Sequence, residues 1–142
     1  YIAMHKRGNP LTMSGMTDYE DVVRDVKAYF DKFSIKADSY GIKDWILDPG
    51  VGFSKTIDQN YELLKSLEIF KTVRIAEGRS PRILVGVSRK SLIYRYLNIS
   101  PDESLPATQV LNFAALQNGA DILRVHDVAE AARTVALYRQ LA

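Results

Sequence analysis

Four short apolar runs in this chain each end in a compact cluster of polar and glycine residues, and each cluster precedes a stretch with helical periodicity. The clusters begin at Met4, Asp48, Gly86 and Arg124. In parallel α/β proteins, polar residues at the ends of successive strands collect on one edge of the sheet and form a site there. The pattern therefore predicts an α/β fold with a functional site at the carboxyl ends of its strands.

The even spacing of the clusters limits the possible architectures. The separations between Met4, Asp48, Ser88 and His126 are 44, 40 and 38 residues. A strand, a helix and a second strand within such a length form a right-handed parallel crossover. Four such units fit either a small doubly wound sheet or half of a (β/α)8 barrel, a fold of about 250 residues. The periodicity alone does not choose between these two folds.

The helices expected between the clusters have recognisable start and stop signals. Thr17–Glu20 has the spacing of a capping box, which predicts that the first helix begins there and stops at Gly41. Asp127 suits the N-terminal cap of a closing helix. Other helices are expected from about residue 56 to Phe70, over 91–97 and over 107–117.

Composition excludes several classes of protein. The 142 residues suit one domain with its own core, and the net charge of +2 comes without the basic stripe of a nucleic-acid binder. The chain has no cysteine, which excludes disulfides and thiolate metal sites and fits the cytoplasm, and no apolar run approaches the roughly 20 residues of a membrane span. The sequence starts at Tyr1, within an apolar run that is expected to form a strand. We therefore expect the chain to be a piece of a longer one.

The cluster after the second apolar run points to a ligand. Asp48 should lie at the mouth of the sheet, where both carboxylate oxygens could accept hydrogen bonds from adjacent N–H groups of a planar heterocycle. Gly52 should allow the backbone to approach that ligand closely. An Asp that only caps the next turn is the alternative, but a turn does not require the following Phe53 and Lys55.

The third and fourth clusters carry cations. Arg89 and Lys90 precede a helix start, which favours an anion-binding corner, with a solvated basic turn capped by Ser88 as the alternative. Gly86 indicates close packing against something flat. Arg124 and His126 alternate at a strand end, so both side chains should face one side and could hold a phosphate or pyrophosphate, although a lone histidine is more often structural. The spacing of the two histidines is no metal-ligand pattern.

Taken in order, these segments resemble the dihydropteroate synthase family of folate biosynthesis. The resemblance covers essentially the whole chain, and its matching stretches are residues 4–10, 47–55, 85–91 and 124–128. It implies that residues 1–142 are the C-terminal part of a single pterin-binding (β/α)8 barrel domain. This part would supply strands five to eight and their helices, and the N-terminal half of the barrel would be absent.

The resemblance also implies a transferase reaction, in which para-aminobenzoate displaces pyrophosphate from 6-hydroxymethyl-7,8-dihydropterin diphosphate to give 7,8-dihydropteroate. Sulfonamides would compete with the aminobenzoate. A magnesium ion would assist, with its main protein ligand in the missing half. The full-length protein would be a cytoplasmic homodimer that binds neither nucleic acid nor membrane.

Site roles follow from the same resemblance. Asp48 and Lys90 would hold the pterin, Ser91 would receive the aminobenzoate carboxylate, and Arg124 and His126 would bind the departing pyrophosphate. Catalytic roles are thus expected of Lys90, Arg124 and His126. Substrate-binding roles are expected of Met4, Asp48, Gly52, Phe53, Lys55, Gly86, Ser88, Arg89, Lys90, Ser91, Arg124 and His126.

Two alternatives remain beside this interpretation. A pterin-binding methyltransferase uses a related barrel and a carboxylate on the same ring edge, but it has no pyrophosphate to hold, which leaves Arg124 and His126 unexplained. The isolated chain could instead be an inactive fragment or an assembly module, because half a barrel leaves two open strand edges.

Overall fold

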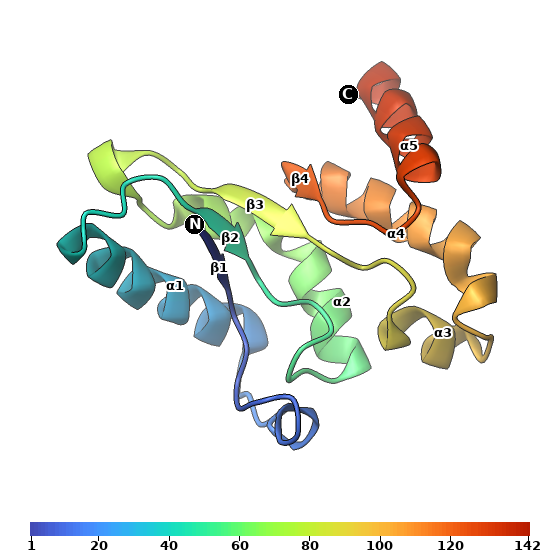
Figure 1. Cartoon of the computed structure of the whole chain (residues 1–142), viewed down its shortest axis with the longest axis horizontal. Helices are drawn as coiled ribbons and strands as arrows, with labels where there is room; N and C mark the ends of the chain where they lie inside the picture. Colours follow the sequence, from blue (N-terminus) through green and yellow to red (C-terminus); the bar gives the residue numbers. More distant parts are fainter.

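The computed structural model describes residues 1–142, and its four strands form one parallel sheet with the order β1-β2-β3-β4 (Figure 1). In this sheet Met4 pairs with Asp48, and Val85 pairs with Leu123. The predicted strands and their parallel arrangement are confirmed. The strands are β1 (Ile2–Met4), β2 (Ile46–Asp48), β3 (Arg82–Val85) and β4 (Ile122–Leu123).

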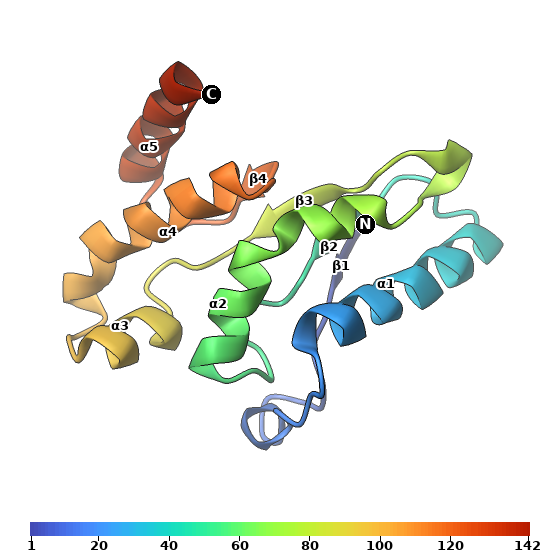
Figure 2. The same cartoon turned by 180° about the vertical axis from the view of Figure 1, so that it is seen from behind.

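The helices lie on one side of this sheet. Helices α1, α2 and α4 cover the face seen in Figure 2, and the opposite face, seen in Figure 1, carries no helix. A doubly wound sheet has helices on both faces, whereas successive right-handed crossovers in one direction place every helix outside a barrel. The arrangement is therefore that of half a (β/α)8 barrel. The helices are α1 (Val22–Ser39), α2 (Ile57–Lys65), α3 (Ser91–Leu97), α4 (Leu105–Gln117) and α5 (Val128–Leu141).

The first helix begins later than predicted. The capping box at Thr17–Glu20 does not form, and Asp21 caps α1 by accepting a hydrogen bond of 2.8 Å from the backbone N–H of Arg24. The carbonyl of Thr17 instead accepts a hydrogen bond from the side chain of Gln59 in α2. The prediction was wrong here because a tertiary contact, which the spacing does not encode, uses this segment. The predicted stop is confirmed, since α1 ends at Ser39 and Gly41 follows with a φ of +71°.

The second helix begins where it was predicted and ends early. Thr56 and Gln59 form a reciprocal capping box at its start. The helix stops at Lys65, and a separate 3-10 helix, Leu67–Thr72, carries the rest of the predicted apolar stripe. Leu67 and Phe70 remain fully buried in it. The shorter predicted helices match α3 and, within two residues, α4.

The core lies between the sheet and the helices. Phe30 of α1 stacks on Trp45, with 6.1 Å between the ring centroids, and meets Phe70 edge-on. Leu47 and Ile83 of the neighbouring strands are fully buried in the same core cluster. This packing fixes β2 and β3 and hence the loops that leave their carboxyl ends. No helix of the chain is both long and apolar enough to cross a bilayer.

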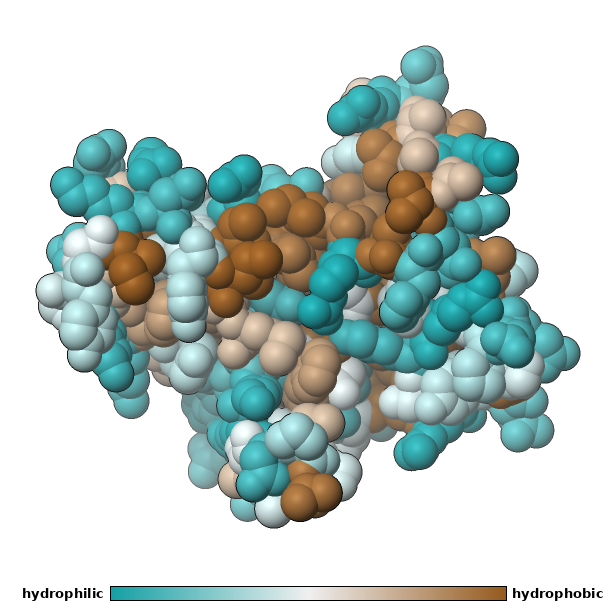
Figure 3. Space-filling view, viewed as in Figure 1, coloured by the Kyte–Doolittle hydropathy of each residue, from teal (hydrophilic) through white to brown (hydrophobic).

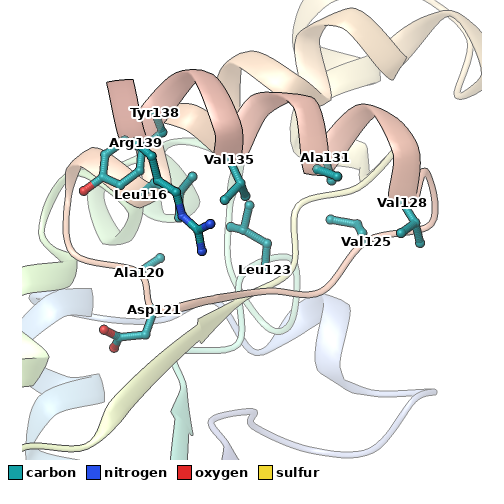
Figure 4. A pocket seen from close by; sticks show the side chains of 11 residues that line it. Leu116, Ala120, Asp121, Leu123, Val125, Val128, Ala131, Val135, Tyr138 and Arg139 are labelled. Atoms are coloured by element: carbon teal, nitrogen blue, oxygen red, sulfur yellow. The ribbon is translucent and has the colours of Figure 1, made fainter. Parts of the chain in front are cut away.

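Both edges of the sheet carry apolar surface. Beside β4, a groove of about 380 Å³ is lined by Leu123, Val125 and residues of α4 and α5, with Val128 and Val135 facing it from α5 (Figure 4). At the other edge, a groove of about 460 Å³ lies beside Tyr1. Apolar residues also gather over the face of the sheet that carries no helix (Figure 3). The chain therefore exposes apolar surface where its sheet ends.

We expect residues 1–142, expressed alone, to self-associate or aggregate. Unpaired strand edges flanked by apolar side chains favour pairing with another chain; Tyr1 and Ile2 at the β1 edge are 71% and 54% exposed. Light scattering over a range of concentrations measures this. A monodisperse monomer at all concentrations would contradict the prediction.

Candidate functional site

A polar cavity of about 290 Å³ lies at the carboxyl edge of the sheet. It is formed by the loops that follow β3 and β4, so residues 38 positions apart in sequence share it. Two of its side chains, Lys90 and Arg124, are cationic. The complete lining is Gly86, Ser88, Lys90, Arg124, Val125 and His126.

Asp48 ends β2 beside this cavity and is 3% exposed. One carboxylate oxygen accepts a hydrogen bond of 2.8 Å from the backbone N–H of Gly50, and the other lies 4.0 Å from Nη2 of Arg124. Burial raises the pKa of Asp48, while the Gly50 N–H and the nearby cations Arg124 and Lys90 act in the opposite direction. The carboxylate therefore makes the predicted turn and also faces the cation of another strand, so the two interpretations of Asp48 are compatible.

Lys90 reaches the same place from the start of α3. Its Nζ donates a hydrogen bond to the carbonyl of Val51 and lies 4.7 Å from the ring centroid of Phe53. Burial, reinforced by Arg124, lowers the pKa of Lys90 to about 8, although Asp48 opposes the shift. The loops after β2 and β3 thus meet through one ammonium group.

Gly52 leaves room for the side chain of Lys90. A Cβ at Gly52 would lie 2.8 Å from Cδ of Lys90. The residue also has a φ of +85°, which disfavours any side chain. In this structure the close approach is therefore made by the Lys90 side chain.

Arg124 and His126 face one side of the chain after β4, as predicted, and Val125 faces α5 (Figure 4). Nδ1 of His126 lies 3.0 Å from the hydroxyl oxygen of Ser88, which also accepts the backbone N–H of His126. A Cβ at Gly86 would lie 3.0 Å from Nε of Arg124. The guanidinium of Arg124, a flat group, thus lies close to Gly86.

Arg89, predicted at the anion corner, does not line the cavity in this structure. Its Nε and Nη2 donate hydrogen bonds of 3.0 and 2.9 Å to the two carboxylate oxygens of Asp127. The carboxylate of Asp127 consequently makes no cap for α5, and the hydrogen bonds from Arg89 lower the pKa of Asp127. The pair ties the loop after β3 to the loop after β4.

Six other predicted residues also lie outside the lining. Asp48, Gly52 and Phe53 lie beside its cations Arg124 and Lys90, whereas Lys55, Ser91 and Met4 have other surroundings. The side chain of Lys55 folds back on its own loop, and its Nζ donates hydrogen bonds to the backbone carbonyls of Gly50 and Phe53. Ser91 is the first residue of α3, directly after Lys90. Met4 ends β1 opposite Asp48. The structure therefore brings together Asp48, Gly52, Phe53, Gly86, Ser88, Lys90, Arg124 and His126.

Sequence reasoning missed two side chains that hold the loop after β2. The backbone N–H of Gly52 donates a hydrogen bond of 2.6 Å to Asn60 of α2, which is 3% exposed. The hydroxyl of Ser54 accepts the backbone N–H of Arg7 and donates to the Arg7 carbonyl. The one available signal was a polar residue, Asn60, beside the apolar stripe of α2.

The residues of this chain do not form a magnesium site. No three His, Asp or Glu side chains come close enough to hold a metal ion. The cavity side chains Lys90 and Arg124 are cations, which repel a metal ion rather than bind it. We therefore derive no chemical step through magnesium.

The half barrel and the polar residues at the carboxyl ends of its strands are features of barrel enzymes, whose sites lie at this edge. Residues 1–126 match the family of pterin binding enzymes, and the chain belongs to this family. The chain is 40% identical over 129 residues to dihydropteroate synthase of Escherichia coli K12, covering 89% of the chain and 44% of that enzyme. The predicted resemblance is confirmed.

Solved structures show the same relation. The dihydropteroate synthase of Thermus thermophilus in complex with 4-aminobenzoate gives a TM-score of 0.88 at 31% identity, over 99% of this chain and 56% of that one. The Burkholderia cenocepacia enzyme in complex with 7,8-dihydropteroate gives a TM-score of 0.87 at 34% identity. This match covers 99% of this chain and 51% of that one. The predicted fold is confirmed, and the chain spans about half the length of the relatives it matches.

Binding of an anion whose own charge is constant in this range, such as sulfate, should weaken as the pH rises through the pKa of Lys90, which is about 8. An anion favours the charged ammonium, so affinity should fall by up to about tenfold per pH unit above that pKa. Calorimetric titration of the intact protein between pH 6.5 and 9.5 measures the trend. The variant Lys90→Met should lose this slope, whereas Lys65→Met, which changes an exposed lysine of α2, should keep it. An identical slope in Lys90→Met would contradict the assignment.

Proposed function

We propose that the protein to which residues 1–142 belong is a dihydropteroate synthase. It would join 6-hydroxymethyl-7,8-dihydropterin diphosphate to para-aminobenzoate, releasing pyrophosphate. The observation that carries the proposal is the convergence of Asp48, Lys90 and Arg124 from three successive strands on one cavity edge. The relatives named above, one of them in complex with 4-aminobenzoate and one with 7,8-dihydropteroate, support it.

The pterin would lie against Asp48. Its amino-pyrimidine edge presents adjacent N–H donors, and the Asp48 oxygen that faces Arg124 is free of backbone hydrogen bonds. Phe53, already in contact with the Lys90 ammonium, would form a wall of the pterin slot together with Met4 and Gly86. Lys90 would exchange its bond to the Val51 carbonyl for one to the pterin ring.

The diphosphate would lie toward Arg124 and His126. The guanidinium offers several donors to phosphate oxygens, and His126 is oriented by Ser88. As the bond between the pterin methylene and the diphosphate breaks, negative charge grows on the leaving group, and fixed cations stabilise that charge. No covalent intermediate with the protein is required, and the amine of the aminobenzoate would attack the methylene carbon.

The remaining expectations extend this proposal. Ser91, next to Lys90, would receive the carboxylate of the aminobenzoate, and sulfonamides would compete there. Magnesium would take its main protein ligand from outside residues 1–142. The intact protein would act as a homodimer, and residues 1–142 alone would be inactive because they form only part of the site.

The direct test is to incubate the intact protein with the pterin diphosphate and labelled para-aminobenzoate and to measure labelled dihydropteroate. Formation of the product is expected, together with one equivalent of pyrophosphate. Binding of the pterin without any product would instead favour the pterin-binding methyltransferase alternative.

Replacement of Asp48 by Asn should weaken pterin binding about 100-fold, because it removes a charged acceptor and places a donor opposite another donor. Titration of the intact protein with the pterin diphosphate measures the dissociation constant. Asp44→Asn is the matched control, since Asp44 is exposed in the segment before β2. Equal affinities of the two variants would refute the role of Asp48.

Replacement of Arg124 by Ala should impair pyrophosphate handling more than aminobenzoate binding. Pyrophosphate affinity should fall about tenfold or more with the loss of charged hydrogen bonds, while the KM for para-aminobenzoate should change less than threefold. Arg95→Ala, at an exposed position of α3, is the control. Equal loss for both ligands would show that the role of Arg124 is misassigned.

A further inference from the structure

Lys55 joins the ends of two strands through one atom. Its Nζ lies 3.1 Å from the carbonyl oxygen of Gly50 and 2.9 Å from that of Phe53, both in the loop after β2. The same Nζ lies 3.1 Å from Nδ1 of His5, the residue that follows β1. An ammonium group has three N–H donors, and here it has three partners.

His5 is a fixed partner for this contact. The residue is 4% exposed, and its ring packs edge-on against Tyr29 with 5.0 Å between centroids. Its backbone also contacts the loop, since a Cβ at Gly50 would lie 1.8 Å from the His5 carbonyl oxygen. The loop after β2 therefore rests on His5 at two points, one through the backbone and one through Lys55.

The loop that Lys55 holds, Pro49–Lys55, contacts two residues of the site, Asp48 and Lys90. Gly50 donates its N–H to Asp48, and Phe53 contacts the ammonium of Lys90. A shift of the Gly50 or Phe53 carbonyl would therefore move Asp48 and Lys90 relative to each other. Lys55 itself does not line the cavity.

We propose that Lys55 is a positioning residue that, through His5, locks the loop Pro49–Lys55 to the end of β1 and so holds Asp48 and Phe53 in their places beside the cavity. The lock itself follows from the contacts of Lys55. Its effect on pterin binding rests on the function proposed above.

The pair keeps its hydrogen bond whether or not Lys55 is charged. Burial, with Arg7 and Lys90 nearby, lowers the pKa of Lys55 to about 7, against the opposing effect of Asp48. Burial, Lys55 and Arg7 lower the pKa of His5 to about 3. Neutral imidazole has two tautomers: with an ammonium, Nδ1 accepts, and with a neutral amine, Nδ1–H donates. The contact therefore persists as the pH crosses 7. The other titratable groups facing the His5 ring are Tyr19 and Tyr29.

Four variants of the intact protein test the lock. Lys55→Met keeps the aliphatic chain and removes the donors, and Lys65→Met is the control at an exposed lysine. His5→Asn keeps an acceptor near the position of Nδ1 but loses the ring, whereas His5→Phe keeps a ring and loses the acceptor. If His5 only packs, His5→Phe should be tolerated and His5→Asn should not. The proposal expects the reverse.

The first readout is independent of activity. Hydrogen exchange of the backbone amides of residues 50–53 should accelerate about tenfold in Lys55→Met and His5→Phe, because one buried hydrogen bond is lost. The pKa of His5, followed by nuclear magnetic resonance, should rise in Lys55→Met because a neighbouring cation is gone. The double variant Lys55→Met, His5→Phe should be no worse than either single one, since both remove the same contact.

The second readout is the affinity for the pterin diphosphate. It should fall about tenfold in Lys55→Met and His5→Phe and stay within twofold of the wild type in His5→Asn and Lys65→Met. Unchanged exchange and affinity in Lys55→Met would overturn the lock. If Lys55→Met does not fold, the comparison of His5→Asn with His5→Phe decides alone. A response in exchange without any pterin binding by the wild type would uphold the lock and refute the proposed function.

Discussion

The buried carboxylate of Asp48 is the constraint on which the rest of the site depends. A carboxylate that is 3% exposed loses most of its hydration and must be compensated by hydrogen bonds and cations. The structure supplies one backbone N–H and three cations, Arg124, Lys90 and Lys55, which all favour the charged form of Asp48. Of these, Lys90 and Arg124 line the cavity, so its lining is positively charged, and this charge supports the anionic ligand proposed for it.

The cations reach Asp48 only because the loops are tied to one another. The loops after β3 and β4 are joined by Arg89 with Asp127 and by Ser88 with His126. The loop after β2 is joined to β1 by Lys55 and to α2 by Asn60. Each tie links segments that are distant in sequence or lie in different elements, so the cavity is a property of the assembled sheet. Two charged residues of the motifs, Lys55 and Arg89, therefore connect loops to neighbouring segments in this structure.

The sequence predicted the strands, most helices and the edge of the sheet where the polar clusters meet, because apolar runs and their spacing encode these directly. It did not choose between a barrel and a doubly wound sheet, since the face on which a helix packs depends on the direction of every crossover. The capping box at Thr17–Glu20 failed for a related reason: Gln59, 42 residues away, uses the Thr17 carbonyl. The hydrogen-bond partners of Lys55 and Arg89 could not be predicted from the sequence either. A charged residue within a ligand motif favours the interpretation that it contacts the ligand.

Two glycines of the motifs, Gly52 and Gly86, leave room for the side chains of Lys90 and Arg124. Lys90 crosses over Gly52, where a Cβ would lie 2.8 Å from its Cδ, and Arg124 crosses over Gly86, where a Cβ would lie 3.0 Å from its Nε. Each glycine lies on the strand-end loop next to the one that carries the cation. A side chain at Gly52 would require the Lys90 side chain to shift, and one at Gly86 would press on the Arg124 side chain. The glycine of one motif and the cation of the next therefore act as a pair, which is why neither motif by itself defines the chemistry of the edge.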